Sequence, residues 1–271
     1  MFLEDILPST TPRYKYEGIP QCLRILEQEQ ERHESARSFN PYLIFFAVDE
    51  SSFLKCFVNS DKSLITQSWE MYDHSSHNVL VKLSTTSLIE AAATFDSIFS
   101  TWARRVQNNL LTATSSSPVS TETRSKRADL SWTPAHPPVG RSSQWPTVIV
   151  EASWSERRRK LENDVGFWLN KSNGQVKVVL TIAVHPGGRI DIEKWDLPPV
   201  PGSKATPCST QKIEIVRDPA PNTSKVRGRL DVKFQDVFLR EKEGTETDFA
   251  LSHSDMEEIA MKVWASQLEK I

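Results

Sequence analysis

Cysteine is scarce in this chain of 271 residues. Its three cysteines, Cys22, Cys56 and Cys208, are far apart, and no two of them form a CxxC pair. The odd number and the wide spacing argue against a disulfide framework and against a structural zinc site. Reduced thiols are typical of intracellular proteins. We therefore expect an intracellular location, either nuclear or cytoplasmic.

Glycine, long apolar runs and an excess of one charge are also missing. Nine glycines with no P-loop argue against a glycine-rich nucleotide-binding scaffold. No run reaches the roughly 18 apolar residues of a membrane helix, so we expect no membrane partner. The net charge of −2 and pI of about 6.3 exclude a histone-like protein, whose pI would exceed about 9. Contact with nucleic acid would therefore need a local basic patch.

The apolar pattern that is present predicts an α/β protein with a central mixed sheet, flanking helices and added β-hairpins. We expect one domain, 1–271, in these parts: an N-terminal extension 1–68, a core of about 69–185, a flexible Ser/Thr-rich insertion 112–125, and C-terminal strands and a helix 186–271. Helices are expected at 20–35, 85–106, 155–172 and 255–268. Strands are expected at 41–50, 55–58, 77–84, 127–134, 145–153, 175–185, 189–196, 211–218 and 229–240.

Two acids stand at strand positions on either side of a proline-rich loop. Asp129 lies in RADLSW, and Glu151 follows the apolar run Val148–Val150. A buried carboxylate is costly unless it is paired, hydrogen-bonded or bound to a metal. Mg²⁺ is a hard ion that one or two carboxylates and water can hold, and it can promote phosphodiester cleavage. The alternatives are a solvated strand-end acid for Asp129 and a salt-bridged acid for Glu151.

The order of strand acid, loop, strand acid, helix and apolar strand resembles the PD-(D/E)XK (restriction-endonuclease-like) nuclease superfamily. The sequence segments more closely resemble an uncharacterised fungal branch of this superfamily. The resemblance covers roughly 69–185 and rests on the segments WEMYDHSSHNVLVKL, SLIEAAATF, RADLSWTP, WPTVIVEASWSE and NDVGFWLNKSNGQVKVVLTIAV. It implies a restriction-endonuclease-like core in which Asp129 and Glu151 hold Mg²⁺ or Mn²⁺.

The chain departs from the family pattern at several positions. Ser153 stands two residues after Glu151, where the family has a lysine that positions the attacking water. In some members that lysine comes from the following helix, and Lys160 is then the nearest candidate. Glu90 matches the family's helix acid, although Ile89 replaces the preceding histidine. The alternative for Lys160 and for Glu90 is a solvated helix residue.

Basic residues gather near the two acids, which favours a nucleic-acid partner, DNA before RNA. These contact candidates are Arg127, Arg157, Arg158 and Arg159. The alternative is an ordinary exposed helix face, because acids stand beside these residues. Two hypotheses follow: a Mg²⁺-dependent nuclease-like domain, or a catalytically silent member that binds nucleic acid or a protein partner. The missing lysine at Ser153 favours the second. The sequence does not indicate an oligomeric state.

Overall fold

The structure is a computed structural model that describes residues 3, 6–35, 40–106, 110–115, 117–154, 158–198, 206–218 and 224–268. The chain forms two compact units. The first unit consists of Met1–Thr85 and Ser116–Ala128, and the second of Thr86–Ser115 and Asp129–Ile271. Each unit is described by itself. The expectation of a single domain means that neither unit folds without the other, and it stays a prediction.

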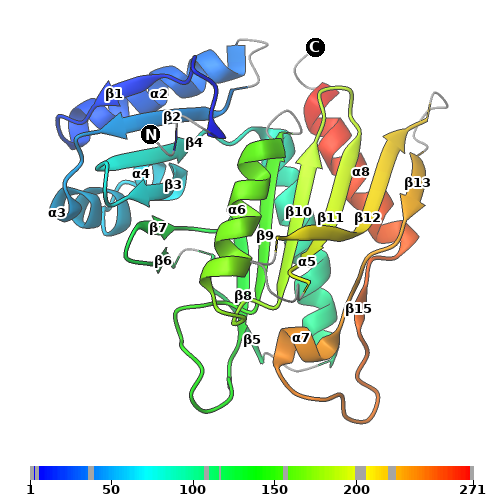
Figure 1. The fold of residues 1–271 in the computed structure, drawn as a ribbon. Helices are drawn as coiled ribbons and strands as arrows, with labels where there is room; N and C mark the ends of the chain where they lie inside the picture. The colour runs from blue at the N-terminus through cyan, green and yellow to red at the C-terminus, as the bar shows by residue number, and fades with distance from the viewer. Residues whose placement is uncertain are drawn as a thin grey trace. The chain divides into compact units, whose positions relative to one another are not determined.

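The first unit contains a six-stranded mixed sheet with the order β1-β2-β4-β3-β7-β6 (Figure 1). Its strands are β1 (Arg13–Lys15), β2 (Tyr42–Phe46), β3 (Trp69–Asp73), β4 (Asn78–Lys82), β6 (Val119–Ser120) and β7 (Arg124–Lys126). Its helices are α2 (Ile19–Ser35), α3 (Glu50–Phe53), the π-helix η1 (Leu54–Val58) and α4 (Ser63–Ser68). The helix expected at 20–35 and the strands expected at 41–50 and 77–84 are confirmed as α2, β2 and β4.

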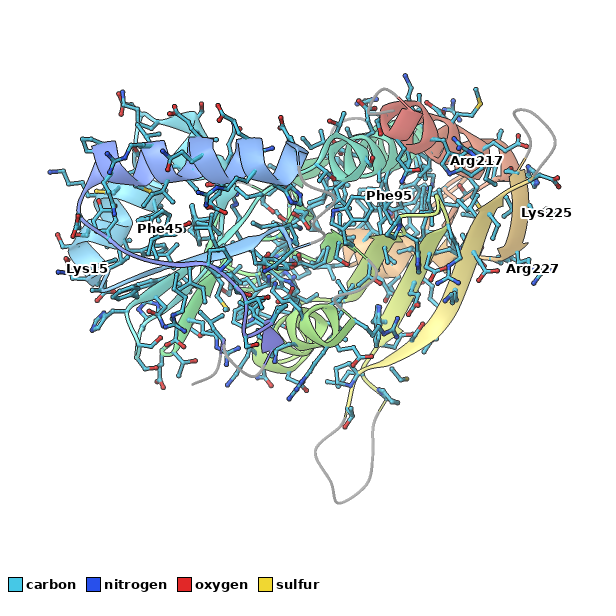
Figure 2. The ribbon with its side chains drawn as sticks, turned by 90° about the horizontal axis from the view of Figure 1, so that it is seen from above. Lys15, Phe45, Phe95, Arg217, Lys225 and Arg227 are labelled. Carbon is cyan, nitrogen blue, oxygen red and sulfur yellow. The ribbon has the colours of Figure 1, made fainter. Side chains whose placement is uncertain are left out.

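The core of the first unit forms where α2 packs on the sheet. Residues alternate along the strands, so that Leu43 and Phe45 contribute to this core while Ile44 belongs to a smaller cluster. Phe45 is labelled in Figure 2. The strand expected at 55–58 is wrong, because these residues form η1. Phe53, Cys56 and Phe57 are buried, at three- and four-residue spacing, which is the spacing of one helix face, whereas a strand would bury alternate residues.

The Ser/Thr-rich segment 112–125 differs from the flexible insertion that we expected. Its described residues include most of β5 (Leu111–Ala113), all of β6 and part of β7. Serine hydroxyl groups form hydrogen bonds across the paired strands, as between Ser120 and Ser125. A serine-rich composition is therefore compatible with a strand here. Val119 provides apolar burial for the hairpin that β6 and β7 form.

The second unit contains a seven-stranded sheet with the order β13-β12-β11-β10-β9-β8-β5 and a small β14–β15 pair. The remaining strands are β8 (Leu130–Pro134), β9 (Val148–Trp154), β10 (Val178–Val184), β11 (Ile190–Asp196), β12 (Cys208–Arg217), β13 (Ser224–Gly228), β14 (Asp231–Val232) and β15 (Phe249–Ala250). The helices are α5 (Thr86–Val106), α6 (Arg158–Lys171), α7 (Phe234–Phe238) and α8 (His253–Leu268). The expected α/β class with a mixed sheet, flanking helices and β-hairpins is confirmed.

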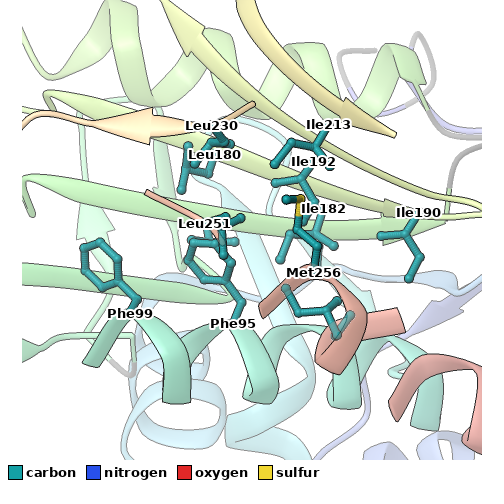
Figure 3. Packing of buried hydrophobic residues seen from close by; sticks show 14 of the residues in the cluster. Phe95, Phe99, Leu180, Ile182, Ile190, Ile192, Ile213, Leu230, Leu251 and Met256 are labelled. Atoms are coloured by element: carbon teal, nitrogen blue, oxygen red, sulfur yellow. The ribbon is translucent and has the colours of Figure 1, made fainter. Parts of the chain in front are cut away.

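The large sheet has one apolar face, which carries the core of the second unit. Alternate residues of the central strands, among them Leu180, Ile182 and Ile192, lie in one cluster with Phe95 and Phe99 of α5 (Figure 3). Helix α8 adds to the same cluster. At the sheet edge, β13 carries Lys225 and Arg227, and such charges oppose pairing with another strand (Figure 2).

The strand expected at 229–240 is largely wrong. Only β14 lies there, and the following residues form the short helix α7. Phe234, Val237 and Phe238 are buried at three- and four-residue spacing, which is the spacing of one helix face. The other expected elements of this unit are confirmed, with α6 described from Arg158 onward and 155–157 outside the described residues.

The end of β13 generates the first prediction, because Gly228 has a φ of +91° and a Cβ there would overlap the carbonyl oxygen of Lys212. Gly228→Ala should lower the free energy of unfolding by about 2–4 kcal/mol, from overpacking and an unfavourable φ together. Gly140 is the matched control, since its φ is +87° and nothing lies within 4 Å of its added Cβ. Urea denaturation measures both variants, and equal losses would contradict the overlap.

Candidate functional site

The two predicted acids are neighbours across the β8–β9 pair. The strands are antiparallel and Leu130 pairs with Val150, so the next position outward sets Asp129 opposite Glu151. Asp129 Oδ2 accepts a hydrogen bond of 2.7 Å from the backbone N–H of Ala152, the residue that follows Glu151. The structure therefore brings together the two acids that the sequence nominated.

Glu151 lies on the polar face of the large sheet. Its strand neighbours Val150 and Ala152 belong to the apolar cluster, so the alternation of β9 turns Glu151 to the opposite face. Trp168 of α6 donates its indole N–H to Glu151 Oε1 at 2.6 Å, which places α6 over this face. The Glu151 residue is 2% exposed and Trp168 is 1% exposed. The carboxylate is therefore buried beneath the helix.

Lys160 lies on the same inner side of α6 as Trp168. The buried positions of the helix recur at three- and four-residue spacing and include Lys160, Asp164 and Trp168. Lys160 is 1% exposed, and its ammonium donates to Asp164 Oδ2 at 2.6 Å. The alternative that Lys160 is a solvated helix residue is therefore wrong. Asp164, which the sequence did not nominate, is its partner, and the i,i+4 spacing of opposite charges is the signal that could have found it.

Further acids that the sequence did not nominate extend the polar face across the sheet. Register places Glu151, Thr181, Glu193 and Lys212 in one row over β9, β10, β11 and β12. Lys212 Nζ lies 3.5 Å from Glu193 Oε1 and 3.2 Å from Asp191 Oδ2. Strict alternation in RIDIE, with isoleucines on the core face, is the signal that could have assigned both acids to the polar face.

Two of the predicted arginine contacts, Arg127 and Arg158, are engaged with protein groups. Arg158 donates to Glu162 and Glu193 and lies over the Trp195 ring at 4.7 Å. Burial lowers the pKa of Arg158, but hydrogen bonds to Glu193 and Glu162 outweigh it and leave the pKa raised. Arg159 is exposed, whereas Arg157 lies outside the described residues.

Arg127 belongs to the first unit, where its guanidinium donates to the backbone carbonyls of Thr66 and Gln67 and lies over Trp69. Glu90 lies on α5, in the second unit. Helix α5 packs on the apolar face of the sheet, opposite the face that carries Glu151. No contact between Glu90 and the two acids is found among the described residues, and its assignment as an auxiliary acid stays a prediction.

The donor set of the two acids fits a hard divalent cation. Mg²⁺ needs only one or two carboxylates, with water and substrate phosphate completing its shell. Asp129 and Glu151 provide two carboxylates at adjacent positions of paired strands, and each already has one oxygen fixed by an N–H donor. In the part of the chain that the structure describes, no group of three or more His, Cys, Asp or Glu side chains is placed to hold a metal ion. A cation here would therefore depend on these two carboxylates.

Comparisons with known proteins assign no family. No family model matches the sequence, and no curated protein matches it. Among solved structures, a protein of Anabaena variabilis ATCC 29413, described as a candidate nuclease belonging to DUF820, is similar at 12% identity and a TM-score of 0.36. The similarity covers 55% of this chain and 88% of that one. It is a distant structural resemblance. Separately, no described helix is long and apolar enough to cross a membrane.

The hydrogen bond from Trp168 to Glu151 generates the second prediction. Trp168→Phe should leave a buried carboxylate with one donor fewer and cost about 1–3 kcal/mol beyond the loss of ring area. Trp132→Phe is the matched control, because Trp132 is also buried and its indole N–H has no partner among the described residues. Chemical denaturation of both variants measures the difference. Equal destabilisation would contradict a stabilising role for the Trp168 N–H.

Proposed function

We propose that the second unit is a Mg²⁺-dependent nuclease domain that hydrolyses phosphodiester bonds of DNA. The observation that carries this proposal is the hydrogen bond of 2.7 Å from Ala152 N–H to Asp129 Oδ2. It fixes the first acid beside the second, at the place where α6 covers the polar face of the sheet. Two carboxylates at neighbouring positions are the ligands that a hard divalent cation prefers.

In this proposal the residues have distinct roles. Asp129 and Glu151 would hold Mg²⁺ or Mn²⁺, which when bound lowers the pKa of its water and neutralises phosphate charge. The Ala152 N–H and the Trp168 N–H orient the two carboxylates. Lys160 would take the role of the absent lysine at position 153, where it orients the attacking water and stabilises developing charge. Its burial on the inner side of α6 supports this role.

A second candidate function is a catalytically silent module that binds nucleic acid or a protein. It is favoured by the hydrogen bond between Lys160 Nζ and Asp164 Oδ2, because this ammonium already has a buried counter-ion. Ser153 stands where the family has a lysine, and its Oγ is buried with no partner among the described residues. In this alternative the polar residues beneath α6 hold the helix on the sheet and do no chemistry.

Cleavage of supercoiled plasmid distinguishes the two functions and is the third prediction. The wild type should nick the plasmid with Mg²⁺ or Mn²⁺ and lose this activity with a chelator. Asp129→Asn and Glu151→Gln should each reduce cleavage by about a hundredfold or more, because each removes a charged metal ligand. Glu257→Gln, an exposed acid on α8, is the control and should cleave like the wild type.

Equal cleavage by the wild type and both site variants would indicate a contaminating nuclease and overturn the enzymatic proposal. Binding of labelled duplex DNA, measured by fluorescence anisotropy at two salt concentrations, then tests the silent module. Affinity that falls with salt indicates contacts to phosphate. No binding at low salt would leave a protein as the partner of that module.

The role of Lys160 gives the fourth prediction. Lys160→Met alone leaves Asp164 buried without its ammonium, and breaking a buried pair costs about 3–5 kcal/mol. The double variant Lys160→Met/Asp164→Leu replaces the whole pair with apolar groups, which is often neutral for stability. We expect it to fold but not to cleave plasmid, whereas Asp164→Asn, which keeps Lys160, should retain cleavage. Cleavage by the folded double variant would remove Lys160 from the mechanism.

A further inference from the structure

The first unit contains a chain of polar side chains that none of the proposed nuclease chemistry uses. Ser120 Oγ lies 2.8 Å from Ser125 Oγ, and Ser125 Oγ lies 3.0 Å from His74 Nε2. On the other side of the imidazole, His74 Nδ1 lies 3.9 Å from Glu50 Oε1. Two serines and a histidine are thus joined by hydrogen bonds in one line, and the exposed carboxylate of Glu50 lies near its end, beyond hydrogen-bonding distance.

The fold builds this line from a hairpin and a turn. Ser120 of β6 and Ser125 of β7 are directly paired, and Ser125 also pairs with Tyr72 of β3. His74 follows β3, and its backbone N–H donates to Thr123 O in the turn of the hairpin at 3.1 Å. The His74 ring packs edge-on against Tyr72, with centroids 4.9 Å apart. The imidazole is therefore held against the hydroxyl of Ser125 by both backbone and ring contacts.

A proton relay along this line requires one direction of its hydrogen bonds, which the tautomer of His74 sets. With the proton on Nδ1, His74 faces the Glu50 carboxylate with a donor and faces Ser125 with an acceptor. Ser125 Oγ–H then donates to His74 Nε2, and Ser125 Oγ accepts from Ser120 Oγ–H. A hydroxyl whose proton can pass to a base that a third group orients is the pattern of an activated nucleophile.

Accessibility decides which serine would react. Ser125 is 3% exposed, so its hydroxyl cannot reach a substrate. Ser120 is exposed because β6 is the last strand of the six-stranded sheet (Figure 1). The line therefore runs from an accessible hydroxyl, through a buried one, to the imidazole, and the buried serine can only relay the proton.

The geometry points to an acyl-transfer site in the first unit, with Ser120 as the nucleophile and small carboxylic esters as its substrates. Ser120 Oγ forms a bond to the ester carbonyl carbon while its proton moves through Ser125 to His74 Nε2. Collapse of the tetrahedral intermediate breaks the bond to the alkoxide, which leaves as the alcohol with that proton. Water then attacks the acyl-enzyme by the same route and releases the carboxylic acid. Glu50 is a positioning residue, since it acts through His74.

A fluorophosphonate probe tests the site directly. The probe forms a bond from Oγ to phosphorus and loses fluoride, and peptide mass spectrometry locates the label. We expect labelling at Ser120 that Ser120→Ala abolishes and that Ser117→Ala, an exposed serine close in sequence, leaves unchanged. Glu151→Gln should also leave labelling unchanged, so this result does not depend on the nuclease proposal. No labelling of the wild type, or a label on another residue, overturns the inference.

The relay is tested through the rate of labelling. His74→Gln and Ser125→Ala should each slow labelling by about a hundredfold, the contribution typical of a positioned base. Circular dichroism confirms that both variants are folded. An unchanged labelling rate in either folded variant overturns the relay.

Discussion

The hydrogen bond from Trp168 to Glu151 is the contact on which the second unit depends. An ionised carboxylate buried in the middle of a sheet costs on the order of several kcal/mol unless donors replace its water. Trp168 provides one donor, and it can do so only while α6 lies against the polar face. The position of α6 and the burial of the Glu151 carboxylate therefore depend on each other.

The same constraint explains why the polar face carries several charges and not one. Once α6 covers the face, every acid beneath it needs a partner, and the helix and the neighbouring strands provide them. Arg158 reaches Glu193, and Lys212 reaches both Glu193 and Asp191. Such pairs place a positive charge beside each of these acids. The net charge of −2 is thus compatible with a face that is densely charged but locally balanced.

Some of this arrangement could be predicted from the sequence and some could not. The central strands and long helices carry clear periodicity, and the sequence places Asp129 and Glu151 each in a strand candidate, whereas the register that sets them opposite each other comes from the fold. Local sequence patterns do not indicate which side chains contact each other across the fold. The periodicity of α6 does not indicate that Trp168 contacts Glu151, or that Arg158 donates a hydrogen bond to Glu193. Short elements failed for a related reason, because η1 and α7 each span five residues, which is too short for a repeat in the sequence to separate a helix from a strand.

The lysine that the family has at position 153 is replaced here by Ser153, and Lys160 of α6 is the candidate substitute. Ser153 leaves β9 without a cation, while Lys160 provides one from the helix that the Trp168 contact holds in place. A buried ion pair with no role would be replaceable by two apolar side chains at little cost, since burying a charged pair rarely adds net stability. The pair of Lys160 and Asp164 on the inner side of α6 therefore acts either as a device that fixes the register of the helix or as a positioned acid–base group. The two roles separate in the double apolar variant, because register affects stability whereas chemistry affects only turnover.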